Sequence, residues 1–131
     1  METESSPHVD ATPRFRRLEL KGLFHLAEQP DTVEWQPFKR GVDIHRIYGD
    51  GIRGPTAALL RFREASKIPL HEHPGIEHIL VLVGSQSDQN GPIAAGTLVV
   101  NPPGSRHSVE GEAGCIVLAI YNESVRFVQG D

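Results

Sequence analysis

The fold is decided by residues 68–84, IPLHEHPGIEHILVLVG. Within this stretch His71 and His73 stand two positions apart, and Glu77 follows at the start of an apolar run. In an extended chain the side chains at i and i+2 point to the same face, so the two imidazoles are expected to project side by side. Pro74-Gly75 predicts a tight hairpin turn, from which Glu77 returns toward the same point. Nitrogen and oxygen ligands on rigid strands are typical of a site for a divalent transition metal.

A further histidine follows a second predicted strand, in residues 96–107, GTLVVNPPGSRH. The apolar positions predict the strand, Pro102-Pro103-Gly104 predicts the bend that ends it, and His107 comes shortly after. His78, by contrast, has the opposite parity from Glu77 in its own strand. Its side chain is therefore expected to point away from the ion.

Composition limits the classes of function. The chain has 131 residues, which fits one domain that can bury a core without disulfides or a structural metal. Its formal net charge is −4 and its Lys and Arg residues are scattered. We therefore expect no nucleic-acid partner and no binding to an anionic membrane surface.

Cysteine usage and hydropathy indicate the compartment. Cys115 is the only cysteine; it opens an apolar strand and is interpreted as a core residue rather than a reactive thiol. No apolar run approaches the roughly 20 residues that a transmembrane helix needs. The first residues are acidic and polar, unlike a signal peptide, so a cytoplasmic location is expected.

The order of the chain predicts an all-β domain after a short tail. Residues 1–13 are polar and lack periodicity, so they are expected to be disordered, and residues 14–131 form the domain. Leu18 to Leu26 alternate between apolar and polar positions, which predicts a half-buried strand. About eight to ten short strands between Gly/Pro turns are expected in total. The clearest are Val42–Tyr48, Ala57–Glu64, Glu77–Val83, Leu98–Val100, Cys115–Tyr121 and Val125–Val128.

Together, the two histidine-bearing stretches resemble the paired motifs of the cupin superfamily. The resemblance rests on His-x-His, the following Glu and Gly84, then Gly96, Pro-x-Gly and a last His. Two positions depart from the family pattern, Ala65 and Gly111, and neither is a ligand position. The resemblance implies a single-domain, RmlC-like double-stranded β-helix, or jelly-roll barrel. Carried over residue by residue, it also implies four metal ligands: His71, His73, Glu77 and His107.

Between Trp35 and Tyr121 the sequence is similar to a narrower group, the cupin module of the ChrR-type anti-sigma factors. This similarity is carried by residues 73–82, the Asp88-x-x-Gly91 turn, and residues 101–107 and 114–118. The sigma-binding part of those regulators is a separate helical zinc domain rich in His and Cys, which this sequence lacks. The resemblance therefore implies a stand-alone cupin module, and an anti-sigma role is not favoured.

The resemblance leaves more than one function open. The first is binding of one divalent transition metal per chain, with Zn, Fe, Ni or Mn all compatible, together with a small-molecule ligand in the barrel. Related stand-alone cupins include dioxygenases that cleave small diketone-like or hydroxyketone substrates, so an Fe(II)-dependent dioxygenase is the alternative; a regulatory sensor is the third. Polar residues that hydrogen-bond one another without an ion are the plainer interpretation. Desolvating three imidazoles and a carboxylate with nothing to bind would be costly, however.

Other residues have two interpretations each, and no catalytic residue is identified. Trp35 either packs in the core or forms a wall of the ligand pocket. Arg61 either faces solvent or reaches an acidic substrate, and Arg106 either binds an anion or faces solvent. A homodimer is expected because strands such as residues 77–83 are apolar on both faces, with residues 18–26 adding to the partner's sheet.

Overall fold

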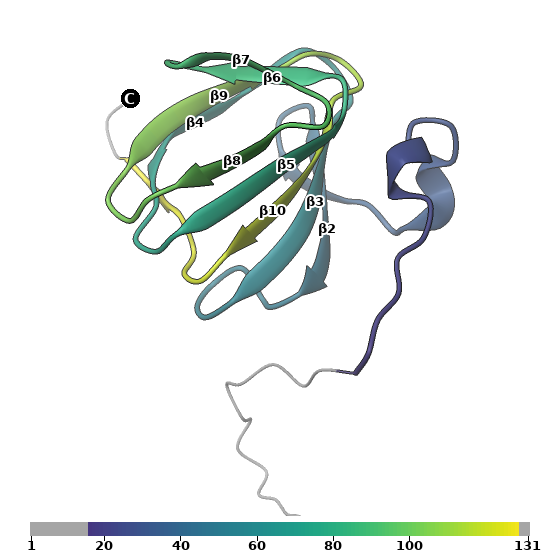
Figure 1. Cartoon of the computed structure of the whole chain (residues 1–131), viewed down its shortest axis with the longest axis horizontal. Coiled ribbons are helices and arrows are strands. Elements are labelled where there is room, and N and C mark those ends of the chain that lie inside the picture. Colours follow the sequence, from purple (N-terminus) through teal and green to yellow (C-terminus); the bar gives the residue numbers. More distant parts are fainter. Residues whose placement is uncertain (1–15, 129–131) are drawn as a thin grey trace, which may run out of the picture.

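Two antiparallel sheets form the protein in the computed structural model, which describes residues 16–128 (Figure 1). The larger sheet has six strands in the order β1 (Gln36–Lys39), β2 (Val42–Tyr48), β3 (Thr56–Phe62), β10 (Ile116–Tyr121), β5 (Glu77–Val83) and β8 (Leu98–Asn101). The smaller sheet has five strands in the order β11 (Arg126–Phe127), β4 (Ser66–Glu72), β9 (Arg106–Gly111), β6 (Ser85–Asp88) and β7 (Gly91–Ala94). The predicted all-β jelly-roll fold is confirmed.

The core between the sheets is built from inward-facing apolar side chains of both layers. Val42, Phe62 and Val81 come from the larger sheet, and Ile68 and Val109 from the smaller one; all are buried. One neighbour of this core has to be a glycine. A Cβ on Gly111 would lie 2.5 Å from the ring of Phe62, so no side chain fits where the cupin pattern departs at this position.

The outer face of the larger sheet is partly covered by the segment that precedes β1. This segment contains two short 3₁₀ helices, η1 (Leu23–His25) and η2 (Pro30–Thr32). Leu26 is fully buried there against outward-facing side chains such as Leu59 and Leu82. The apolar second face of β5 and β10 therefore meets the chain's own N-terminal segment rather than a second sheet.

The predicted strand over Leu18 to Leu26 is wrong. Gly22 has a φ of 73° and begins the η1 turn, which ends extended structure there. Leu20, Leu23 and Leu26 pack toward the sheet, whereas the Phe24 side chain is 69% exposed. The contacts thus recur every third residue, as in a 3₁₀ turn, and the alternation in the sequence is incidental. The tail predicted over residues 1–13 lies outside the described residues.

Residues 68–84 do not form the predicted hairpin. Strand β4 pairs with β9 and β11, whereas β5 pairs with β10 and β8, so the Pro74-Gly75 turn crosses from one sheet to the other. His71 and His73 consequently approach from the smaller sheet and Glu77 from the larger one.

In the described residues, no helix is long and apolar enough to cross a membrane.

Candidate metal centre

Three imidazoles meet at one end of the barrel. His71 lies on β4, His73 follows that strand, and His107 lies on β9, where it is the direct cross-strand partner of His71. The ring centroids are 5.1 Å apart for His71 and His73, and 4.7 Å apart for each of the other two pairs. One ring nitrogen from each histidine lies within 4.8 Å of the other two, and all three residues are buried. This cluster could hold a metal ion.

Hydrogen bonds at Nδ1 fix the orientation of two of these rings. The Nδ1 atom of His71 lies 2.8 Å from the Pro69 carbonyl oxygen, and that of His107 lies 3.0 Å from Asp88 Oδ2. A carbonyl or carboxylate oxygen only accepts, so both Nδ1 atoms donate. In the neutral imidazole this places the proton on Nδ1 and leaves the Nε2 lone pair free for a ligand role.

The same assignment follows for His73 by one further step. Its Nδ1 lies 2.9 Å from Ser105 Oγ, and the Ser105 hydroxyl donates its only proton to the Pro102 carbonyl at 2.7 Å. Ser105 therefore accepts from His73, and Nε2 of His73 is again left with its lone pair. All three imidazoles are prepared in the tautomer that metal-binding histidines adopt.

Glu77 reaches the cluster from the opposite sheet. Its Oε1 lies 2.9 Å from His73 Nε2 and accepts a hydrogen bond from Asn101 Nδ2 at 3.0 Å. Burial raises the pKa of the Glu77 carboxyl, but the neighbouring His73 and the bond from Asn101 outweigh it and hold the pKa below its usual value. Burial also lowers the pKa of His71. Glu77 is therefore a carboxylate and His71 a neutral imidazole, which are the forms that metal ligation requires.

The contact between His73 and Glu77 is the test of whether an ion fits. The buried Nε2 of His73 makes no hydrogen bond within the described part of the chain, although the carboxylate oxygen is 2.9 Å away. The two atoms are close without being aligned as donor and acceptor. Two groups aimed at a common third point have this geometry, and three imidazole nitrogens with one carboxylate oxygen suit a divalent transition metal.

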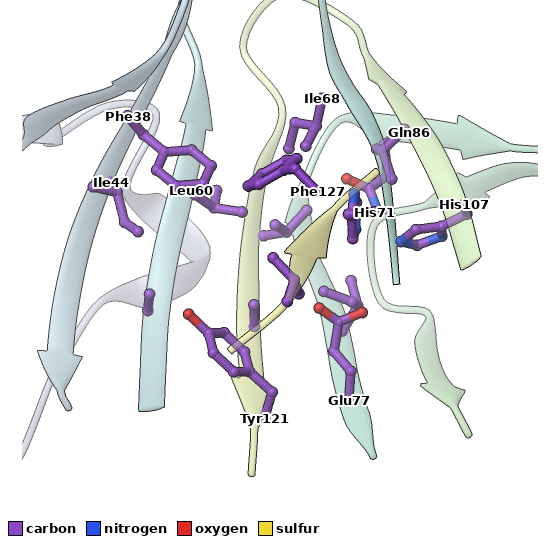
Figure 2. A pocket seen from close by; sticks show the side chains of 16 residues that line it. Phe38, Ile44, Leu60, Ile68, His71, Glu77, Gln86, His107, Tyr121 and Phe127 are labelled. Carbon is purple, nitrogen blue, oxygen red and sulfur yellow. The ribbon is translucent and has the colours of Figure 1, made fainter. Parts of the chain in front are cut away.

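A mostly apolar cavity of about 60 Å³ lies next to the cluster. Figure 2 shows His71, His107 and Glu77 along one side of it, with Phe38 and Leu60 across from them. Two other polar side chains line the cavity, Gln86 and Tyr121. Burial raises the pKa of Tyr121, so its phenol stays protonated at neutral pH.

The three residues predicted to contact a ligand lie elsewhere. Trp35 packs on the outer face of the larger sheet and donates from Nε1 to the Pro30 carbonyl at 2.8 Å. The Arg61 guanidinium lies 4.6 Å from the Trp35 ring centroid and donates to Asp43 at 2.7 Å. Arg106 is exposed and lies 3.4 Å from Glu72. None of the three lines the cavity, so the structure gives no support for their predicted role.

Two other sequence interpretations agree with the structure. Cys115 is fully buried, and burial raises its pKa to about 12, as befits a core thiol. His78 is absent from the lining of the cavity and from the histidine cluster. Sequence reasoning missed Asp88, Ser105 and Asn101 as partners of the cluster, because all three lie in or beside predicted turns and carried no other signal of their own. The one available signal was that every ligating histidine needs an acceptor for its other nitrogen.

Comparison with protein families decides the assignment, because the model of the ChrR cupin-like domain matches residues 25–124. The chain belongs to this family. A comparison with curated proteins finds no significant match to this cupin-like domain. Solved structures resemble it in fold, and three of them are described below.

The first is an RmlC-like cupin protein from Ralstonia eutropha JMP134, with 23% identity, a TM-score of 0.62, and coverage of 72% of this chain and 66% of that one. The second is the Rhodobacter sphaeroides complex of SigE with the anti-sigma factor ChrR, with 29% identity, a TM-score of 0.59, and coverage of 69% and 49%. The cupin-like domain thus spans less than two thirds of the length of both. The third, from Methylibium petroleiphilum PM1, is a protein proposed to be an acetylacetone dioxygenase, with 16% identity, a TM-score of 0.71, and coverage of 90% and 85%.

Proposed function

We propose that this cupin-like domain binds one divalent transition-metal ion through His71, His73, His107 and Glu77. The observation that carries the proposal is the buried, unpaired Nε2 of His73 beside a carboxylate that it does not hydrogen-bond. Three hydrogen bonds support it, because they fix the side chains of the proposed ligands. Asp88 accepts from Nδ1 of His107, Ser105 accepts from Nδ1 of His73, and Asn101 donates to Oε1 of Glu77. Zn, Fe, Ni and Mn all accept this set of donors.

The proposed role of the site is to hold a small molecule in the adjacent cavity. A bound divalent ion would supply Lewis acidity and a point of attachment for oxygen atoms. The protein supplies the rest. The apolar walls exclude water, and the hydrogen bonds that the three Nδ1 atoms donate keep the imidazoles from rotating.

Metal content of purified variants tests the site directly. We expect about one equivalent of metal per wild-type chain, by elemental analysis after purification without chelators. His107→Gln should lose most of it, because a ligand is replaced by an amide. His78→Gln is the matched control, since His78 lies on the same strand as Glu77 and outside the cluster, and it should retain the metal. Equal metal content in both variants would rule the site out.

An Fe(II)-dependent dioxygenase that cleaves a small diketone or hydroxyketone is the second candidate. The observation that favours it is the small apolar cavity directly beside the cluster, which can shelter such a molecule. The likeness to the Methylibium protein concerns the fold alone at 16% identity. The test is oxygen uptake by the Fe(II)-loaded protein with pentane-2,4-dione. No uptake above the rate of free Fe(II) would remove this candidate.

A regulatory sensor is the third candidate and has less support. The likeness to the ChrR complex covers 49% of that chain. Residues 16–128 are taken up by the two sheets and the segment that covers one of them. We also propose a cytoplasmic location, supported by the free, buried thiol of Cys115.

A further inference from the structure

The side-chain amide of Gln86 is a polar group that lines a cavity and forms no hydrogen bond within residues 16–128. The residue is 6% exposed and lies on β6, paired with Ile93 on one side and Gly111 on the other. Its amide atoms are not among the enclosed side-chain atoms that lack a partner, so they are accessible from the space beside them. An amide in this position can hydrogen-bond an ordered water molecule or a ligand in the cavity.

This amide borders the cavity of the candidate metal centre. Gln86 lines the cavity together with His71 and His107. Figure 2 shows the amide end of Gln86 next to His71, on the side of the imidazoles remote from Glu77. A molecule held at the histidine cluster would therefore have the Gln86 amide within reach of one of its polar atoms.

The remaining walls of the cavity define what kind of molecule fits. Apart from the cluster residues, Gln86 and Tyr121, all lining residues are apolar, and none is Lys or Arg. Arg61 pairs with Asp43, and Lys39 Nζ does not line the cavity but lies 3.9 Å from the ring centroid of Phe127, one of its walls. A free carboxylate in this cavity would lose its hydration without gaining a cationic partner. The volume of about 60 Å³ admits only a small molecule.

We propose that Gln86 is a ligand-binding residue, which hydrogen-bonds an oxygen atom of a small ligand with apolar substituents and no charged group remote from the ion. This inference rests on the proposed metal site, since the ion anchors the ligand's oxygen atoms. It assigns the selectivity of the cavity to its walls: uncharged oxygen ligands bind, and dicarboxylates of equal size do not.

Pentane-2,4-dione and malonate are suitable probes. Both present two oxygens in a 1,3 arrangement, and malonate carries a second carboxylate oxygen where the diketone carries each methyl group. The measurement is a titration of the Co(II)-loaded full chain, followed by the visible absorption of the ion. We expect wild type to bind the diketone at least about 10-fold more tightly than malonate. Gln86→Leu should weaken diketone binding by roughly 10-fold, because one hydrogen bond is lost. Gln36→Leu, the same change on an exposed strand position, should leave it unchanged.

A second measurement separates ligand binding from a structural role. Because the Gln86 amide forms no hydrogen bond within residues 16–128, Gln86→Leu should keep the wild-type unfolding temperature and the wild-type cobalt content. A lowered unfolding temperature with lost cobalt would overturn the inference, as would wild-type affinity of Gln86→Leu for the diketone or equal affinity for the two probes. Wild-type protein that takes up no cobalt would instead overturn the proposed metal site itself, and this inference with it.

Discussion

At the scale of single residues, each of the two carboxylate oxygens of Asp88 has its own role. Oδ1 accepts a hydrogen bond from the Asn90 backbone at 2.8 Å and shapes the turn, while Oδ2 orients His107. Asp88→Asn keeps the size of the side chain and removes its charge, so we expect metal affinity to fall by about 10- to 100-fold. Asp50→Asn is the control, because Asp50 shapes a turn in the same way without contacting a histidine. Equal metal dissociation constants for the two variants, from competition with a chelator, would contradict the role of Asp88.

The residues that meet at the candidate metal centre were found from the sequence, whereas the residues that orient them were not. His71, His73 and Glu77 lie close together along one stretch, and strand parity places the two histidines on one face, although Glu77 reaches them from the other sheet rather than across the predicted hairpin. Asp88 and Asn101 meet their partners only across strand pairings between distant segments. Those pairings depend on the order of strands in each sheet, and a single sequence does not specify that order.

At the scale of elements, the pairing of β2 with β3 places one aspartate against two arginines. Asp43 Oδ2 lies 2.7 Å from Arg61 Nη2 and 2.9 Å from Arg63 Nε. Burial raises the pKa of Asp43, but the two guanidinium groups outweigh it and lower the pKa overall. As the pH falls, the unfolded chain therefore takes up its proton first, near its own pKa of about 3.9. The stabilisation is present above that pH and is lost as the pH falls toward the lower pKa of the folded state.

Asp43→Asn measures this contribution. We expect the variant to lose about 1–2 kcal/mol of stability at pH 7, because two guanidinium groups lose their charged partner. Hydration of the half-exposed Arg63 side chain replaces only part of the lost interaction. The difference from wild type should shrink below about pH 4. Urea unfolding at pH 7 and pH 3 gives both values. A difference that is independent of pH would show that the ion pairs do not contribute.

The limits of two strands were predicted correctly, for different reasons. Residues 77–83 match β5, which is apolar on both faces, and residues 42–48 match β2, where apolar and polar side chains alternate from Val42 to His45. The failures were at connections. The turn at Pro74-Gly75 was recognised, but whether a turn joins neighbours in one sheet or crosses between two sheets depends on the packing of the whole barrel.

At the scale of the whole molecule, one row of side chains on the larger sheet is left partly exposed by the described segment, residues 16–128. Strands β8, β5 and β10 lie side by side (Figure 1). Val100, His78 and Ile120 are direct cross-strand partners on these strands, so their side chains share one face of the sheet. Val100 is 49% exposed and Ile120 is 37% exposed, and Leu98 beside them is 59% exposed. None of these residues is Lys, Arg, Asp or Glu. A twofold axis brings such a row against its own copy without like-charge repulsion, so we propose this face, rather than residues 18–26, as the contact surface of the expected homodimer.

Sedimentation at micromolar concentration tests the dimer. We expect twice the mass of one chain for wild type and a monomer for Val100→Lys, because the lysine places two ammonium groups against each other and removes apolar contact area. Ile52→Lys is the control: Ile52 is 75% exposed in the loop between β2 and β3, away from β8, and its replacement should leave the dimer intact. Equal unfolding temperatures for both variants would show that the monomer is folded. A wild-type monomer would leave the exposed row without a partner of its own kind, and the outer face of β8 would then be free to bind a different protein.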